Sequence, residues 1–431
     1  MGNQNQPQKA TKAQRIIACV LTALFIPAIF GFGLYGVATD FSGILNSVKF
    51  YKAKNYLADP EDTGFFSMTQ ARIASLQNRL GSALPLEGEM NVLNATFQYA
   101  LGKQMVVKGA DQVLRLPNRQ LYYITTRETL ADEAQEVVDL YEYLGGETPF
   151  LFSYVHPGFF NGGMQLPDGY SVMDTSDELA DEVLGIVRAA GIEALDSRTF
   201  FEGTGLTNEE LELKTDKHWT ALAALLAAQI YAGKINELTG AALDAGRLQL
   251  DQFDTATYED LFFGDFGRLV GLGNAQADDI TTYLPKYPTD ITRHSEIRAS
   301  EGGDIIDISG PFETSVLRSD MLERPETGLN KGAYRAYGLI EAFETLDNNG
   351  DCADITVLVL RDSYSEPICS FLSLAVKRVV SADLRYYAGT AVDLIEEYQP
   401  DIVIVSYSRL MFEDHGYDFG VPEAAENTIL A

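Results

Sequence analysis

Two short motifs in this sequence carry three side chains that could together perform acyl transfer. Asp216 and His218 stand two residues apart, directly before Trp219. A carboxylate so placed could orient the imidazole, fix its tautomer and stabilise its charged form. Ser363 follows the apolar run 355–360, in an Arg-Asp-Ser-Tyr-Ser motif. A serine on a strand-to-helix turn presents its hydroxyl outward, as a nucleophile requires.

Each motif also has a purely structural interpretation. Asp216 could cap the helix predicted over residues 219–238. Asp362 or Ser363 could likewise cap a helix predicted over residues 367–376. Taken singly, both arrangements are common. The two together favour catalysis, because a nucleophile, a base and an orienting carboxylate then belong to one domain.

The elements that must position these motifs alternate between strands and helices. Apolar runs predict strands over residues 121–124, 150–155, 192–195, 355–360, 378–381 and 402–405. Helices are predicted over residues 129–144, 177–190, 219–238, 367–376 and 390–398. This alternation predicts an α/β fold with a mainly parallel sheet and helices on both faces. Ligands of such sheets bind beyond the carboxyl ends of the strands, where Ser363 stands. Residues 245–335 break this alternation and predict a loop-rich insertion of loops and short strands.

Composition excludes several classes of protein. The chain has 431 residues, 46% of them hydrophobic and 11% aromatic, which favours a large folded core over disorder. Acidic residues outnumber basic ones 62 to 32, so the formal net charge is -30. A nucleic-acid binder needs a basic surface and is therefore excluded. The three cysteines form no metal-binding pair, and neither a metal nor a cofactor is predicted.

The amino terminus predicts a membrane anchor. Residues 16–38 contain no charged side chain, and 23 helical residues reach about 34 Å, enough to cross a bilayer core. Only basic charges precede this segment, so residues 1–15 are expected in the cytoplasm and the rest outside. A cleaved signal peptide ending near residues 36–38 is the alternative, but the apolar stretch is longer than such peptides carry. The main domain is exported under both interpretations. A core helix of a cytosolic protein is a third alternative, which the uncharged length and the flanking charges disfavour.

These features predict five regions along the chain. They are a cytoplasmic tail (1–15), an anchor (16–38), a juxtamembrane helical region (39–105), a catalytic domain (106–412) and a carboxyl-terminal tail (413–431).

The order and spacing of the motifs resemble the alginate O-acetyltransferase-like DHHW family, the AlgX and AlgJ type of SGNH-hydrolase-like proteins. The resemblance covers roughly residues 105–410 and rests on blocks 107–109, 121–123, 215–219, 360–365, 383–387 and 398–405. It implies a triad in which Ser363 is the nucleophile, His218 the general base and Asp216 its orienting group. It also implies acetyl transfer to an exported polysaccharide, with acetyl supplied by a membrane-bound O-acyltransferase.

Several further residues are candidates for binding the substrate. Backbone N–H groups of Ser363, Tyr364 or Gly267 could hold an oxyanion. Tyrosine rings could stack on sugars, with ordinary packing as the alternative. The candidates are Trp219, Tyr364, Gly267, Arg268, Tyr334 and Tyr337.

Two other functions fit the same residues. One is a non-catalytic polysaccharide-binding or scaffold subunit of an acetylation complex, and the other is a carbohydrate esterase. A triad does not distinguish an esterase from a transferase, because that choice depends on acceptor binding and on the exclusion of water. The favoured prediction is a single-pass membrane protein that acetylates a polysaccharide outside the cytoplasm.

Overall fold

The structure, a computed structural model, divides the chain into two compact units, Met1–Asn94 and Ala95–Ala431. It describes residues 68–69, 72–73, 87–108, 111–158, 166–171, 173–299, 303–325, 329–338, 341–414 and 417–422. The predicted anchor, residues 16–38, lies outside these ranges. Within them, no helix has the length and apolar character that a bilayer crossing requires. The features discussed below belong to the second unit.

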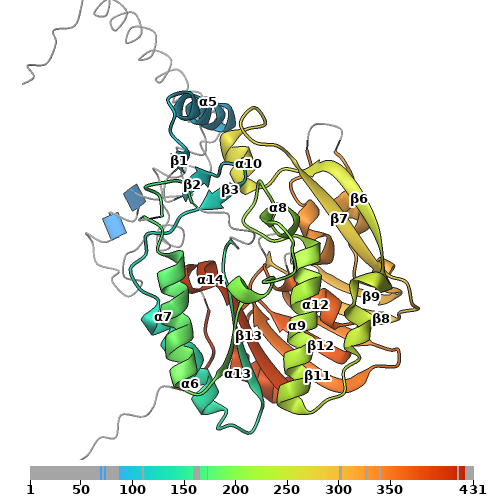
Figure 1. The fold of residues 1–431 in the computed structure, drawn as a ribbon. Helices are drawn as coiled ribbons and strands as arrows, with labels where there is room; N and C mark the ends of the chain where they lie inside the picture. Colours follow the sequence, from blue (N-terminus) through green and yellow to red (C-terminus); the bar gives the residue numbers. More distant parts are fainter. Residues whose placement is uncertain are drawn as a thin grey trace, which may run out of the picture. The chain divides into compact units, whose positions relative to one another are not determined.

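An eight-stranded mixed sheet forms the centre of the second unit (Figure 1). In spatial order its strands are β5 (Glu193–Asp196), β4 (Phe150–Val155), β13 (Ile402–Ser408), β11 (Ala353–Arg361), β12 (Val376–Ala382), β10 (Glu341–Asn348), β8 (Ile291–Ile297) and β9 (Ile305–Gly310). The strands from β5 to β12 run parallel, as predicted. The strands β10, β8 and β9 pair antiparallel, so the prediction of a mainly parallel sheet was incomplete. Parallel pairing needs a long crossover, and the described helices between β8 and β10 have only four or five residues.

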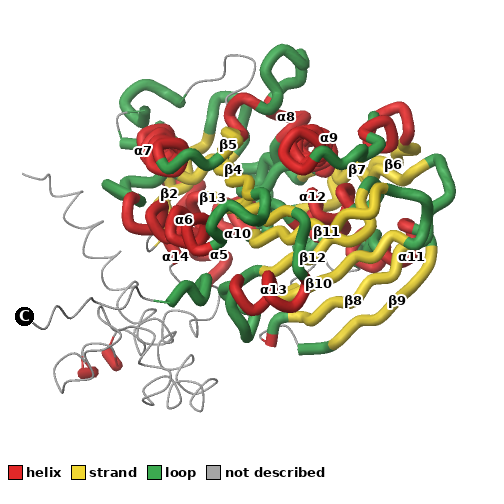
Figure 2. The backbone as a smooth tube through the Cα atoms, turned by 90° about the horizontal axis from the view of Figure 1, so that it is seen from below, coloured by secondary structure: helices red, strands yellow, loops and turns green. Residues whose placement is uncertain are grey.

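Helices cover both faces of the sheet, giving three layers (Figure 2). The helices α9 (Ala221–Thr239) and α12 (Glu366–Leu372) pack on one face. On the other face lie α6 (Ala131–Tyr143), α7 (Ser176–Ala189), α13 (Ala391–Tyr398) and α14 (Arg409–Asp414). Alternate side chains of β11 enter opposite cores: Val357 and Val359 face α9, and Leu358 and Leu360 face α13. Each buried side chain of this kind contributes about 1.5–3 kcal/mol to folding.

The described part of the segment predicted as a loop-rich insertion contains four strands joined by loops and short helices. It supplies β8 and β9 to the main sheet, and it forms a separate antiparallel hairpin from β6 (Phe253–Phe262) and β7 (Asp278–Pro285). The short helix α10 (Asp265–Val270) lies between the two hairpin strands in sequence. Seven consecutive side chains of β6 are exposed, so the strand lacks the apolar alternation by which sequence patterns reveal strands.

A small antiparallel sheet lies beside the motif that contains His218. Its strands are β1 (Met105–Lys108), β2 (Asp111–Arg115) and β3 (Leu121–Tyr123). The predicted strand at residues 121–124 therefore exists but does not join the main sheet. Leu121 N donates to Lys214 O over 2.8 Å, so β3 contacts the loop that leads to His218. Further α-helices in the described part of the chain are α5 (Glu87–Ala100), α8 (Asn208–Leu211) and α11 (Phe312–Ser315).

Candidate active site

Ser363 occupies the turn between β11 and α12, at the carboxyl end of a central parallel strand. Asp362 fixes this turn through both carboxylate oxygens. Oδ1 accepts from Tyr364 N over 3.0 Å, and Oδ2 accepts from Ser408 N, at the end of β13, over 2.8 Å. Asp362 had no predicted catalytic or binding role. An aspartate that bonds the backbone two residues ahead is a common turn device, and that signal was present in the sequence.

A buried ion pair between Arg361 and Glu366 spans the same turn. Arg361, the last residue of β11, donates from Nη1 to Glu366 Oε1 over 2.9 Å. Both side chains are buried, and Glu366 begins α12. The pair therefore joins the end of the strand to the start of the helix on either side of Ser363.

The side chains of Asp216, His218 and Ser363 form one hydrogen-bonded chain. His218 Nε2 lies 2.7 Å from Ser363 Oγ, and His218 Nδ1 lies 2.5 Å from Asp216 Oδ1. With Nδ1–H donated to the carboxylate, Nε2 can accept the serine proton. The Asp216 and His218 residues are 5% and 4% exposed, whereas Ser363 is partly open to solvent. The hydroxyl is thus the accessible end of the chain.

The charge on Asp216 is well stabilised although the side chain is buried. Burial alone raises the pKa of the carboxyl, but the attraction and hydrogen bond of His218 and a 3.1 Å bond from Asp265 N to Oδ2 outweigh it. The resulting pKa is about 2. Asp216 is therefore ionised at any ordinary working pH and can stabilise a positive imidazole.

Asp278, the first residue of β7, holds the loop that carries Asp216. Its Oδ1 accepts from Lys214 N over 2.5 Å, and its Oδ2 accepts from the Thr215 backbone N–H and hydroxyl. Burial raises the pKa of Asp278 to about 6 in spite of these hydrogen bonds. No local pattern in the sequence points to this residue, because its contact forms only when the hairpin reaches a loop 63 residues earlier.

Glycines let α10 approach the same loop closely. A Cβ on Gly264 would lie 2.5 Å from Asp216 Cβ and 2.7 Å from Thr215 O. A Cβ on Gly267 would lie 2.7 Å from Thr215 Cβ. Real Cβ atoms do not come so near to other heavy atoms, so both positions require glycine for this packing.

Hydrogen bonds of Trp219 and Tyr364 join the two candidate catalytic motifs. Trp219 Nε1 donates to Tyr364 O over 2.8 Å, and Tyr364 OH donates to Lys217 O over 2.7 Å. Each motif thus supplies both a donor and an acceptor to the other. The predicted substrate-binding roles of Trp219 and Tyr364 remain predictions, and the contacts of both residues are structural.

The other predicted substrate-binding residues are spread around the site. Tyr334 stacks on His218, with ring centres 4.2 Å apart and planes at 17°. Tyr337 is buried, and its hydroxyl donates to Tyr283 O over 2.8 Å. Gly267 N donates to Thr215 O over 2.9 Å, and Arg268 pairs with Asp265 at the surface. Gly267 N is therefore already engaged.

The oxyanion donors considered from the sequence are reduced to one. Tyr364 N is bonded to Asp362, as described above, and Gly267 N to Thr215. Among the residues that the structure describes, Ser363 N has no hydrogen-bond acceptor. An N–H on the nucleophile itself is a position from which oxyanions are stabilised in acyl transfer.

Comparisons with known proteins agree with this fold. Residues 165–307 match a family model described as an SGNH hydrolase-like domain, acetyltransferase AlgX. The match contains Asp216 and His218 and ends before Ser363. No curated protein matches the chain.

Two solved structures share the fold at low sequence identity. A DHHW family protein from Eubacterium siraeum superposes with a TM-score of 0.53 and 16% identity, over 72% of this chain and 93% of that one. PatB1 from Bacillus cereus, solved with a sulfonyl adduct, gives a TM-score of 0.54 and 18% identity, over 71% of this chain and 99% of its own. These findings confirm the resemblance predicted from the motifs: residues 165–307 are similar to the SGNH hydrolase-like domain of the AlgX acetyltransferase model, and the two solved structures share the fold.

Proposed function

We propose that the chain is an O-acetyltransferase that moves acetyl groups onto a polysaccharide through an acetyl-serine at Ser363. The observation that carries the proposal is the hydrogen-bonded chain from Ser363 Oγ through His218 to Asp216, with separations of 2.7 and 2.5 Å. The match of residues 165–307 to an acetyltransferase domain supports the same chemistry. A scaffold subunit would have no need for a nucleophile so aligned with a base.

The first half-reaction acylates the serine. Ser363 Oγ attacks the carbonyl carbon of an acetyl donor while His218 Nε2 takes its proton. The oxyanion that forms is stabilised by Ser363 N–H. When it collapses, the bond to the donor breaks, and the leaving group takes the proton from His218.

The second half-reaction delivers the acetyl group. A sugar hydroxyl attacks the acetyl-serine, and His218 Nε2 accepts the proton of that hydroxyl. The Ser363–acetyl bond then breaks, and His218 returns the proton to Ser363 Oγ. Asp216 stabilises the charged imidazole in both halves. Water in place of the sugar would give ester hydrolysis, and the partial exposure of Ser363 permits that side reaction.

The setting of the reaction is part of the proposal. Residues 16–38 anchor the chain, residues 1–15 lie in the cytoplasm, and the domain acts outside. The uncharged length of the segment and the basic residues before it support this arrangement. A membrane-bound O-acyltransferase supplies the acetyl group, since extracytoplasmic acetylation needs a donor brought across the membrane.

The test is acylation of the full chain by p-nitrophenyl acetate, followed by release of nitrophenol and by intact mass. We expect a single acetyl adduct on the wild type and none on Ser363→Ala. Ser309→Ala, on the edge strand β9, is the matched control and should react like the wild type. A folded wild type that forms no adduct and releases no nitrophenol would overturn the proposal.

A further inference from the structure

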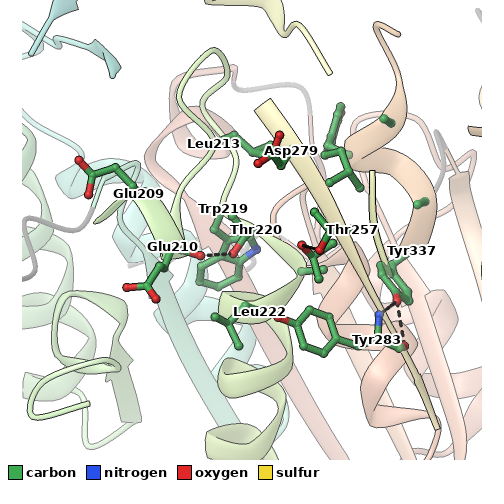
Figure 3. Close-up of a pocket in the computed structure, with 16 residues that line it drawn as sticks. Glu209, Glu210, Leu213, Trp219, Thr220, Leu222, Thr257, Asp279, Tyr283 and Tyr337 are labelled. Carbon is green, nitrogen blue, oxygen red and sulfur yellow. Dashed lines mark hydrogen bonds between the residues drawn. The ribbon is translucent and has the colours of Figure 1, made fainter. Parts of the chain in front are cut away.

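A pocket of about 330 Å³ is lined by Trp219, which directly follows His218 in the sequence (Figure 3). One wall is formed by α8 and the start of α9, and the opposite wall by the β6–β7 hairpin. Neither Ser363 nor His218 lines it. The pocket is therefore a separate hollow, with its own side chains.

The pocket and the triad share a wall. Tyr334 and Trp219 both line the pocket, and Tyr334 also stacks on the imidazole of His218. Trp219 directly follows His218 in sequence. A molecule in the pocket would therefore lie one aromatic ring away from the general base, where an acceptor chain that continues toward Ser363 would pass.

The lining has the chemistry that binds a sugar. Tyr283 and Tyr334 are partly exposed and contribute aromatic surface, on which the C–H face of a pyranose can pack. Trp219 borders the pocket but is only 4% exposed. The hydroxyl of Thr257 and the carboxylates described next accept hydrogen bonds from sugar hydroxyls. Pockets for small ligands combine apolar walls with a few polar groups in this way.

The charge of the lining is acidic without compensation. Glu209, Glu210 and Asp279 line the pocket, and no lysine or arginine does. Hydrogen bonds from the Thr207 backbone and hydroxyl lower the pKa of Glu210, so it is ionised at neutral pH. The cation Arg335 donates to Tyr334 OH over 3.3 Å but is not part of the lining. The chain as a whole also carries -30.

We propose that this pocket binds the acceptor glycan and selects chains that carry no carboxylate, sulfate or phosphate. The inference rests on the proposed function and narrows its substrate class. A uronate in the pocket would lie near the exposed carboxylates of α8 and β7, and their repulsion acts across a solvent-accessible space. A neutral glycan keeps the ring contacts and the hydrogen bonds and avoids that repulsion.

The only tryptophan of the chain is Trp219, so intrinsic fluorescence reports on this pocket. The full chain is titrated with hexasaccharides of glucose, galactose, mannose and N-acetylglucosamine, and with hexasaccharides of mannuronate and galacturonate. We expect at least one neutral hexamer to shift the tryptophan emission. We expect both uronates to bind about tenfold more weakly than that hexamer, or not at all.

Charge-removing variants test the cause of the selectivity. Glu209→Gln with Asp279→Asn keeps the acceptor oxygens that Asn118 and Asp260 N use, and it removes two negative charges. This double variant should reduce the difference in binding affinity between the neutral and the uronate hexamers. Glu396→Gln, an exposed residue of α13 on the other face of the sheet, is the matched control and should leave that difference as it is in the wild type.

Two results would overturn the inference. One is uronate binding as tight as neutral binding, and the other is a folded wild type that binds none of these glycans. Acylation of Ser363 by p-nitrophenyl acetate is measured on the same preparation. An adduct without selectivity removes only the pocket assignment, whereas the absence of an adduct removes the proposed function itself.

Discussion

At the scale of single residues, the imidazole of His218 contacts four side chains. Asp216 and Ser363 take its two nitrogens, and the rings of Tyr334 and Tyr364 lie 4.2 and 4.8 Å from its centre. The ring therefore has little freedom to leave the orientation that the serine needs. In the proposed reaction such preorganisation would lower the barrier, because the base would need no rotation or reorganisation.

Replacement of Asp216 by asparagine should separate orientation from fold. An amide cannot stabilise the charged imidazole and favours the wrong tautomer, so acylation should slow by about 10⁴-fold. The measurement is the burst of nitrophenol from p-nitrophenyl acetate. Asp139→Asn, on the exposed side of α6, serves as the control. Retention of more than a tenth of the wild-type rate by Asp216→Asn would contradict the role given to this carboxylate.

The residues of the candidate triad could be selected from the sequence, because each stands in a short motif at a predicted element boundary. Their hydrogen bonds could not, since Ser363 and His218 are 145 residues apart. Asp278 and Gly264 could not be found at all. Their importance comes from which loop the β6–β7 hairpin and α10 approach, and no local pattern encodes that approach.

At the scale of elements, the site depends on how closely α10 packs against the loop before α9. Gly264 and Gly267 permit that approach, and Asp265 N, at the start of α10, donates to Asp216. The helix has only six residues, so its own stability is small and its position is set by these contacts.

Gly264→Ala should displace Asp216 while the domain stays folded. The added Cβ would overlap Asp216 Cβ and Thr215 O, and overpacking of this kind costs about 1–3 kcal/mol. The rate of acylation should fall by much more than the loss of folded protein explains. Gly273→Ala, where no heavy atom lies within 4 Å of the added carbon, is the control. Equal rates for the two variants would show that the packing of α10 does not position Asp216.

Strands that are buried could be predicted from the sequence more readily than strands that are exposed. The central strands β4 and β13 are buried along their whole length, and their apolar runs predicted them. The strands β6 and β9 present mostly exposed side chains, and the sequence predicted short strands in this segment without their bounds. A two-stranded hairpin and a sheet edge need no continuous apolar face, so no apolar pattern marks where their strands begin and end.

At the scale of the whole molecule, the candidate site affects the free energy of unfolding. Asp278 has a pKa of about 6 in the folded chain because burial disfavours its charge. Its ordinary value is 3.8. Between these values the folded chain retains a proton that the unfolded chain has released. The stability that this proton provides is fully present at lower pH and is lost as the pH rises through that range.

The contribution of Asp278 to stability should be measurable as the pH dependence of the free energy of unfolding. The unfolding free energy of the wild type should fall by about 3 kcal/mol between about pH 4 and pH 6 relative to Asp278→Asn, which cannot ionise. Denaturant unfolding of both full chains across this range gives the difference. The variant also loses a hydrogen-bond acceptor, which changes the level of its stability and not the slope. Parallel slopes for the two proteins would contradict the assignment.

The order of strands in the main sheet has a consequence for biosynthesis. The strand β13, the last to leave the ribosome, lies between β4 and β11. Until it is made, both neighbours have an open apolar edge, and Asp362 lacks the N–H of Ser408 that fixes its turn. The two parts of the sheet on either side of β13 therefore cannot join before this strand is synthesised. A chain that stops before residue 402 therefore lacks both the strand that completes the sheet and the N–H group that fixes the turn of Ser363.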